Sequence, residues 1–298
     1  MASVIGRIAP WRQTAWDWRA AGNFIGGGSG TGTLLIAAAL AGPAYPILTL
    51  LGMGLVGAGL LCVWAEIGRP WRALNVFRHA RTSWMTREAL LAPFLFAAGL
   101  GALAFGGLLL AWITAALALG YLYSQARMLH AGRGIPAWRL GHVIPLMLVT
   151  GCTEGAGLCV MTMALLYPRA MPAWLTLLLA ALLVTRLLVF TSYRRALARA
   201  GAPGKALAVL KDIGRALVVL DVAAALAVII VAQMGAQMRP IGWLVATAGL
   251  LAVLAGWLLK LTIVVGAAFN QGFAVPRMPD RGFGSIRTAV QPGWQGPT

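Results

Sequence analysis

The chain has 298 residues, of which 60% are hydrophobic and only 10% are charged, and its mean hydropathy is +0.82. A soluble core of this size cannot enclose so much apolar surface, so the composition excludes an ordinary soluble domain and indicates a membrane protein. The net charge of +17 would favour nucleic-acid binding in a soluble protein, but here Lys and Arg lie in short loops between apolar runs. We therefore expect membrane lipid, and no nucleic acid, around this chain.

The apolar runs approach the ~20 residues that a membrane-spanning helix needs. The first run should be retained, because the residues before it lack the pattern of a cleavable signal peptide. We predict an all-α, eight-transmembrane-helix bundle over 23–265, after an N-terminal interfacial segment (1–22) and before an extended tail (266–298). The predicted helices cover residues 23–42, 46–66, 88–105, 108–127, 142–166, 173–193, 215–235 and 242–265.

The boundary between the third and fourth predicted helices depends on one dipeptide. Residues 88–127 form an unbroken apolar stretch, which we divide at Gly106-Gly107. A single long, tilted helix over the same stretch is the alternative, and it would reduce the number of helices to seven.

The basic residues predict the orientation of the bundle. With eight helices, both termini and three of the connections share one side, and all of the 24 Lys and Arg residues except Arg169 and Arg239 lie on or near it. The positive-inside rule makes that side cytoplasmic, so we expect both termini there and the protein in the inner membrane. Alternatively, this face is basic because it docks an acidic protein partner. In that case the charge asymmetry does not identify the compartment that the face is in.

The first predicted helix contains the run Gly-Gly-Gly-Ser-Gly-Thr-Gly over 26–32. It is similar to a phosphate-binding loop, but no Gly-Lys-Ser/Thr follows, so a nucleotide site is excluded. We expect these glycines to let helices approach closely.

Three ionisable residues fall at membrane depth, where such groups are costly and therefore informative: Glu154, Arg186 and Asp221. Pairing Glu154 with Arg186 would neutralise both, either as a structural ion pair or as part of a proton path. The histidines lie in or at the edges of charged loops and the cysteines lie in apolar runs. We therefore expect no haem or other metal in this chain.

The connection from Glu66 to Glu88 is dense in arginines and interfacial aromatic residues. Its two carboxylates stand at helix ends and would flank one pocket if those ends meet. A carboxylate beside a partly desolvated pocket can exchange protons, as quinone chemistry requires. In the alternative, Glu88 only stabilises a helix N-terminus, by about 0.3–1 kcal/mol.

Residues 66–90, EIGRPWRALNVFRHARTSWMTREAL, resemble the signature between helices two and three of the dimethyl-sulfoxide-reductase membrane-anchor family. Residues 15–32, 124–139 and 269–282 resemble, in the same order, the branch that forms the membrane subunit of phenylacetyl-CoA:acceptor oxidoreductases. The resemblance implies an eight-helix anchor subunit whose tail docks an iron–sulfur subunit. That subunit would contact a molybdopterin-type (Mo or W) catalytic subunit, while the anchor exchanges electrons with ubiquinone or menaquinone.

The resemblance also implies site residues. The family's carboxylate after the Ser-x-x-x pattern corresponds to Glu88, and Glu66 stands where many anchors have a histidine before Gly-x-Pro. Asn23, Asp17 and Arg19 belong to the N-terminal motif, which lies near the pocket in related anchors. The other residues that we expect at the quinone site are Arg69, His79 and Trp84. Arg69, Arg72 and Arg81 would hold the partner or the headgroup region.

A cytoplasmic docking face favours electron flow from a cytoplasmic substrate, such as a phenylacetyl-CoA-type acyl-CoA, to quinone. This chain would then lack the catalytic site for the substrate itself. Three alternatives remain: a quinol-oxidising anchor of a dimethyl-sulfoxide- or polysulfide-type terminal reductase, a structural anchor with a degenerate site, and a secondary transporter that couples through Glu154, Arg186 and Asp221.

Overall fold

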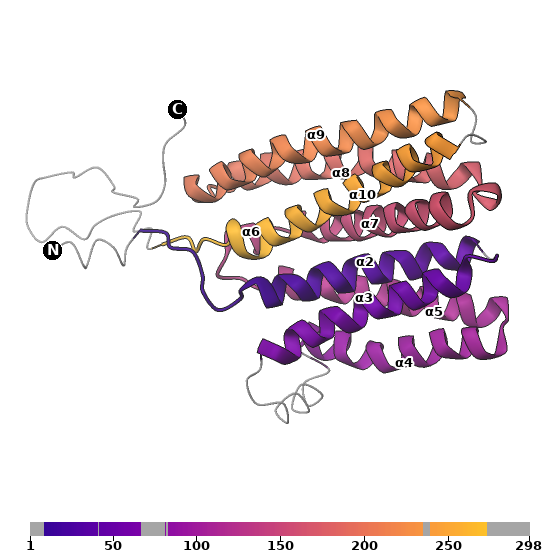
Figure 1. Cartoon of the computed structure of the whole chain (residues 1–298). Coiled ribbons are helices and arrows are strands. Elements are labelled where there is room, and N and C mark those ends of the chain that lie inside the picture. The colour runs from indigo at the N-terminus through magenta and orange to yellow at the C-terminus, as the bar shows by residue number, and fades with distance from the viewer. Residues whose placement is uncertain (1–8, 41, 67–80, 82, 235–238, 273–298) are drawn as a thin grey trace, which may run out of the picture.

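A computed structural model describes residues 9–40, 42–66, 81, 83–234 and 239–272. Within these ranges the chain is helical, with no strand beyond an isolated bridge. The long helices run side by side in one bundle (Figure 1). They are α2 (Trp18–Leu40), α3 (Tyr45–Glu66), α4 (Trp84–Phe105), α5 (Leu108–His130), α7 (Val143–Leu166), α8 (Ala173–Arg199), α9 (Gly204–Met234) and α10 (Arg239–Leu261). The short helices are α6 (Pro136–Arg139), the 3-10 turn η2 (Pro168–Ala170) and the π-helical turn η3 (Thr262–Gly266).

Seven of the described helices, α3 to α5 and α7 to α10, are long and apolar enough to cross a membrane. Their outer surfaces expose large apolar side chains, among them Phe94, Leu109 and Leu188, as expected for contact with lipid. The chain is therefore a multi-pass, all-α membrane protein.

Helix α2 differs from these seven because its middle is rich in Gly, Ser and Thr. It has 23 residues, 16 of them buried, and it packs against α3, α5, α7 and α10. Figure 1 shows it in the middle of the bundle, between the α3–α5 group and the α7–α10 group. The sequence predicts this helix, and the structure places it where the other helices cover it.

Two glycines separate α4 from α5, as the sequence predicts. Gly106 has φ 69° and Gly107 has φ 97°, values that side chains with a Cβ atom rarely adopt. The alternative of one long helix over 88–127 is therefore wrong. Helices α4 and α5 instead form a packed antiparallel hairpin.

Several helices extend beyond their predicted ends. Helix α2 begins at Trp18, α8 continues to Arg199, and α9 begins at Gly204, well before the predicted start at 215. The prediction followed apolar content, whereas Lys and Arg are good helix formers whose long side chains reach water from the membrane surface. The charged residues at these ends therefore continue the helices.

The first and last described segments lie together at one end of the bundle. The backbone N–H of Gln13 donates to the Ala268 carbonyl at 2.9 Å, and that of Asn270 donates to the Trp11 carbonyl at 3.0 Å. Trp138 of α6 closes the same end by donating from Nε1 to the Ile263 carbonyl at 2.8 Å. The predicted docking tail lies mostly in 273–298, outside the described residues.

Candidate functional site

The polar interior is built on α2, whose glycines leave room for side chains from neighbouring helices. A Cβ atom at Gly27 would overlap the amide of Gln125, and one at Gly28 would overlap Nζ of Lys260. Gly26 instead faces the backbone of α3, in the close helix contact that the sequence predicts. The glycine run therefore both packs helices and admits two polar side chains.

A first buried group, here called the Glu88 cluster, consists of Asn23, Glu88, Tyr121 and Gln125. The Glu88 side chain is 3% exposed. Its Oε1 atom accepts hydrogen bonds from Nδ2 of Asn23 at 3.0 Å and from Nε2 of Gln125 at 2.9 Å. The Gln125 amide also donates to the Asn23 carbonyl at 2.9 Å. Helices α2, α4 and α5 are thus joined through one carboxylate.

The Glu88 cluster has hydrogen-bonding capacity left over. Oδ1 of Asn23 and Oε1 of Gln125 are buried without a hydrogen-bond partner among the described residues, and the Tyr121 hydroxyl lies beside Glu88 without a hydrogen bond of good geometry. Glu88 forms no ion pair with any residue that the structure describes. An unsatisfied buried polar atom costs about 1–3 kcal/mol. A further polar group bound here would relieve that cost.

A second group, the Glu154 cluster, consists of Ser29, Glu154, Trp257 and Lys260. Nζ of Lys260 lies 2.6 Å from Oε2 of Glu154, and both side chains are fully buried. The Ser29 hydroxyl donates to the same oxygen at 2.7 Å, and Nε1 of Trp257 donates to the Ser29 hydroxyl at 2.9 Å. This cluster joins α2, α7 and α10 near the middle of the bundle.

The predicted pairing of Glu154 with Arg186 is wrong. Arg186 is paired with Asp221 through two hydrogen bonds, one of them from Nε to Oδ2 at 3.0 Å, and its Nη1 donates to the Ala252 carbonyl at 2.9 Å. The planar guanidinium matches a carboxylate in this two-point geometry. Glu154 is instead neutralised by Lys260. Lys260 was not counted among the predicted intramembrane charges because it stands near a predicted helix end.

Asp17, Arg19 and Glu66 form a separate surface group where α2 begins and α3 ends. Nη2 of Arg19 lies 2.9 Å from Oδ2 of Asp17, and Nη1 donates to the Ala65 carbonyl at 3.1 Å. The adjacent guanidinium holds the pKa of Asp17 below its ordinary value. Glu66 lies near this pair, and no hydrogen bond or ion pair within the described ranges joins it to Glu88.

Trp84 lies at the start of α4 in an aromatic and cationic stack. The guanidinium groups of Arg87 and Arg127 lie 4.1 and 4.7 Å from its ring centre, and Tyr123 meets it edge-on at 5.7 Å. Of the other predicted residues, Arg69, Arg72 and His79 fall outside the described residues, and Arg81 is exposed.

Sequence reasoning did not identify several members of the two clusters. Tyr121 and Gln125 are four residues apart, on one face of a predicted helix, and this polar pair in an apolar run was the available signal. Ser29 is hidden in the glycine run, and Trp257 and Lys260 stand near a predicted helix end. Among the described residues, no three His, Cys, Asp or Glu side chains gather where they could hold a metal ion.

No protein-family model matches the chain, and no curated protein matches it. The class of protein is therefore defined by its own fold and site. It is a multi-pass, all-α membrane protein whose central helix carries two buried polar clusters.

Proposed function

We propose that this chain is the membrane anchor and quinone-reactive subunit of an oxidoreductase complex, and that the Glu88 cluster is its quinone site. One observation carries the proposal: Glu88 is a buried carboxylate with no described cationic partner, beside two buried amide oxygens that accept no hydrogen bond from the described residues. A structural carboxylate would be cheaper to bury with all of its neighbours satisfied.

The chemistry of the donor set fits a quinone headgroup. The oxidised headgroup presents two carbonyl acceptors, and the reduced form presents two hydroxyl donors. The Tyr121 hydroxyl can donate to a carbonyl, and the free amide oxygens of Asn23 and Gln125 can accept from a hydroxyl. The cluster therefore offers hydrogen-bonding partners to both forms.

Each residue has a distinct role in this proposal. Glu88 holds or releases a proton at its carboxylate oxygens, while the amides of Asn23 and Gln125 fix the orientation of that carboxylate. Burial between α2, α4 and α5 excludes bulk water from the proton transfer. A bound quinone supplies the acceptor for two electrons and two protons.

The position of the cluster suits electron delivery from a docked partner. Asn23 lies in the second turn of α2 and Glu88 in the second turn of α4, so both are near one end of the bundle. We place the docking of an iron–sulfur subunit, which contacts a molybdopterin-type catalytic subunit, at this basic end, where Arg69, Arg72 and Arg81 hold the partner. The pairing of residues 11–13 with 268–270 supports a shared side for both chain ends.

The orientation and the direction of electron flow complete the proposal. With α2 as an eighth span, the basic end faces the cytoplasm from the inner membrane, and the complex reduces quinone with electrons from a cytoplasmic acyl-CoA of the phenylacetyl-CoA type. Electron flow in the opposite direction, from quinol to a terminal reductase, would use the same site. The two directions are distinguished by the side of the membrane on which the catalytic subunit lies.

A secondary transporter is the second candidate, supported by the buried charges of the Glu154 cluster and the Arg186–Asp221 pair. Such charges can mark coupling sites. A transporter moves solute as the purified chain alone, whereas an anchor co-purifies with an iron–sulfur subunit and shows no uptake.

The test of the quinone site is the affinity of a fluorescent quinone analogue for the full chain in nanodiscs. Glu88→Gln removes the carboxylate with little change in volume, and we expect it to weaken binding about tenfold or more, the effect of losing a charge-assisted hydrogen bond. Asp212→Asn is the matched control, because this carboxylate is exposed on α9 and should leave affinity unchanged. Equal affinity of the Glu88→Gln variant and the wild-type chain would refute a quinone site at Glu88.

A further inference from the structure

One face of α8 changes from apolar to cationic along its length. Leu177, Val184 and Leu188 are 64%, 54% and 66% exposed, and their spacing puts them on one helix face. The same face continues through exposed Thr191 to exposed Arg195. This order, an apolar stripe that ends in positive charge, is complementary to a phospholipid with an anionic headgroup.

The stripe ends in a pocket of about 520 Å³ between the start of α7 and the end of α8. Its lining combines basic, hydroxyl and apolar side chains and includes no carboxylate. The lining residues are His142, Leu188, Thr191, Ser192, Arg195, Ala196 and Arg199.

We propose that this pocket binds the phosphate of an anionic phospholipid, with an acyl chain lying along the α8 stripe. Arg195 and Arg199 are one helical turn apart and can both reach one phosphate, and the Ser192 hydroxyl can add a donor. Leu188 belongs to both the pocket and the stripe, so headgroup and acyl chain meet there. The proposal does not depend on the quinone site.

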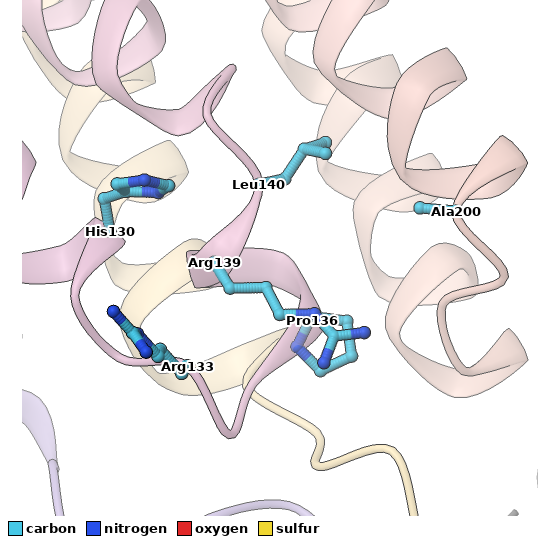
Figure 2. A pocket seen from close by; sticks show the side chains of 6 residues that line it. All are labelled: His130, Arg133, Pro136, Arg139, Leu140 and Ala200. Carbon is cyan, nitrogen blue, oxygen red and sulfur yellow. The ribbon is translucent and has the colours of Figure 1, made fainter.

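A second basic pocket differs in the availability of its arginines. This pocket, of about 490 Å³, lies beside α6, and Figure 2 shows the Arg139 side chain beside Pro136, with Ala200 at the end of a facing helix. The Arg139 guanidinium donates to the Gln271 side chain at 2.6 Å. One of the pocket's two arginines is therefore already occupied.

The location also favours lipid over a soluble protein partner. Leu188 lies in a helix that is long and apolar enough to cross a membrane, on an exposed apolar face that favours lipid over a water-soluble partner. Anionic headgroups are held by basic residues at the membrane surface, at about 1 kcal/mol for each Lys or Arg.

The test is a titration of the full chain in detergent with phosphatidylglycerol, followed by native mass spectrometry. Arg195→Gln and Arg199→Gln should each weaken binding about fivefold, and the double variant should weaken it further. Arg169→Gln is the control, since it removes one exposed charge near η2, away from the pocket, and should leave affinity unchanged. Circular dichroism should show wild-type helicity in every variant, because these side chains are exposed.

Two further ligands distinguish a phospholipid site from a site for free phosphate or for any lipid. Phosphatidylcholine, which is zwitterionic, should bind more weakly and respond little to the arginine substitutions. Glycerophosphate has the phosphate without acyl chains and should bind at least about tenfold more weakly than phosphatidylglycerol, because the contact with Leu188 is lost. Unchanged phosphatidylglycerol binding by the double variant, or equal binding of glycerophosphate, would overturn the proposal.

Discussion

Lys260 and Glu154 form a fully buried ion pair between α10 and α7, and Ser29 of α2 donates to the same carboxylate oxygen. The pair lies where water cannot screen either charge. Its charges are separated by more than a hundred residues in sequence and meet only when the bundle has assembled. Substitutions in this pair therefore report on whether α7 and α10 pack against each other as in the structure.

Lys260→Met should destabilise the protein by about 3–5 kcal/mol, because Glu154 would be left as an uncompensated buried charge. Adding Glu154→Gln should recover much of the loss. The free energy of unfolding in detergent measures both effects. Arg215→Gln is the control: this residue pairs with Asp212 at 3.6 Å on an exposed surface, where a pair contributes about 0–1 kcal/mol. Additive effects of the two cluster substitutions would contradict the pairing.

Gly28→Ala should cost about 1–3 kcal/mol, because the added methyl group would overlap Nζ of Lys260, which the ion pair holds in place. Gly54→Ala on α3 is the matched control. Nothing lies within 4 Å of a Cβ atom at Gly54, so alanine there should be neutral or stabilising by up to about 1 kcal/mol. Thermal unfolding of the two variants gives the comparison, and equal stability would mean that Lys260 does not pack on Gly28.

Tyr121→Phe distinguishes a functional hydroxyl from a structural one. Since the Tyr121 hydroxyl lies beside Glu88 without a hydrogen bond of good geometry, its removal should change stability by less than about 1 kcal/mol. Binding of the quinone analogue should weaken. Tyr193→Phe provides the contrast, because that hydroxyl donates to the Ala137 carbonyl at 2.8 Å and its loss should lower stability by about 1 kcal/mol without changing analogue affinity.

Asp17→Asn should make stability less dependent on acid pH. Arg19 lowers the pKa of Asp17 in the folded protein, so the charged carboxylate contributes stability at neutral pH that is lost as the pH falls below the ordinary value of 3.8. The stability difference between the wild-type chain and the variant should therefore be present at pH 7 and shrink as acid is added. A difference that grows in acid would reverse the assigned direction of the pKa shift.

Much of the fold could be predicted from the sequence, because apolar runs near 20 residues and the Gly106-Gly107 break reflect local rules of chain geometry and lipid partitioning. Helix ends were predicted less well where Lys and Arg continue a helix beyond its apolar part, as in the first turns of α9 after Gly204. Those rules act on one helix at a time.

The candidate site depends on which helices become neighbours, and this limited its prediction. Asn23 and Glu88 were both identified and lie in one cluster, and Glu154, Arg186 and Asp221 are buried charges as expected. The partners were not predictable, because the apolar helix faces look alike in sequence. In the folded bundle Glu154 pairs with Lys260, and Arg186 pairs with Asp221. Gln125 of α5 donates a hydrogen bond to Glu88.

Helix α2 precedes every other described helix, yet two of the helices that bury it, α7 and α10, follow more than a hundred residues later. Its Gly-, Ser- and Thr-rich middle gains little from contact with lipid tails alone. During synthesis, the polar face of α2 is therefore fully covered only after α7 and α10 have been made. A chain released before α10 would therefore leave its central helix without one of the four long helices that cover it.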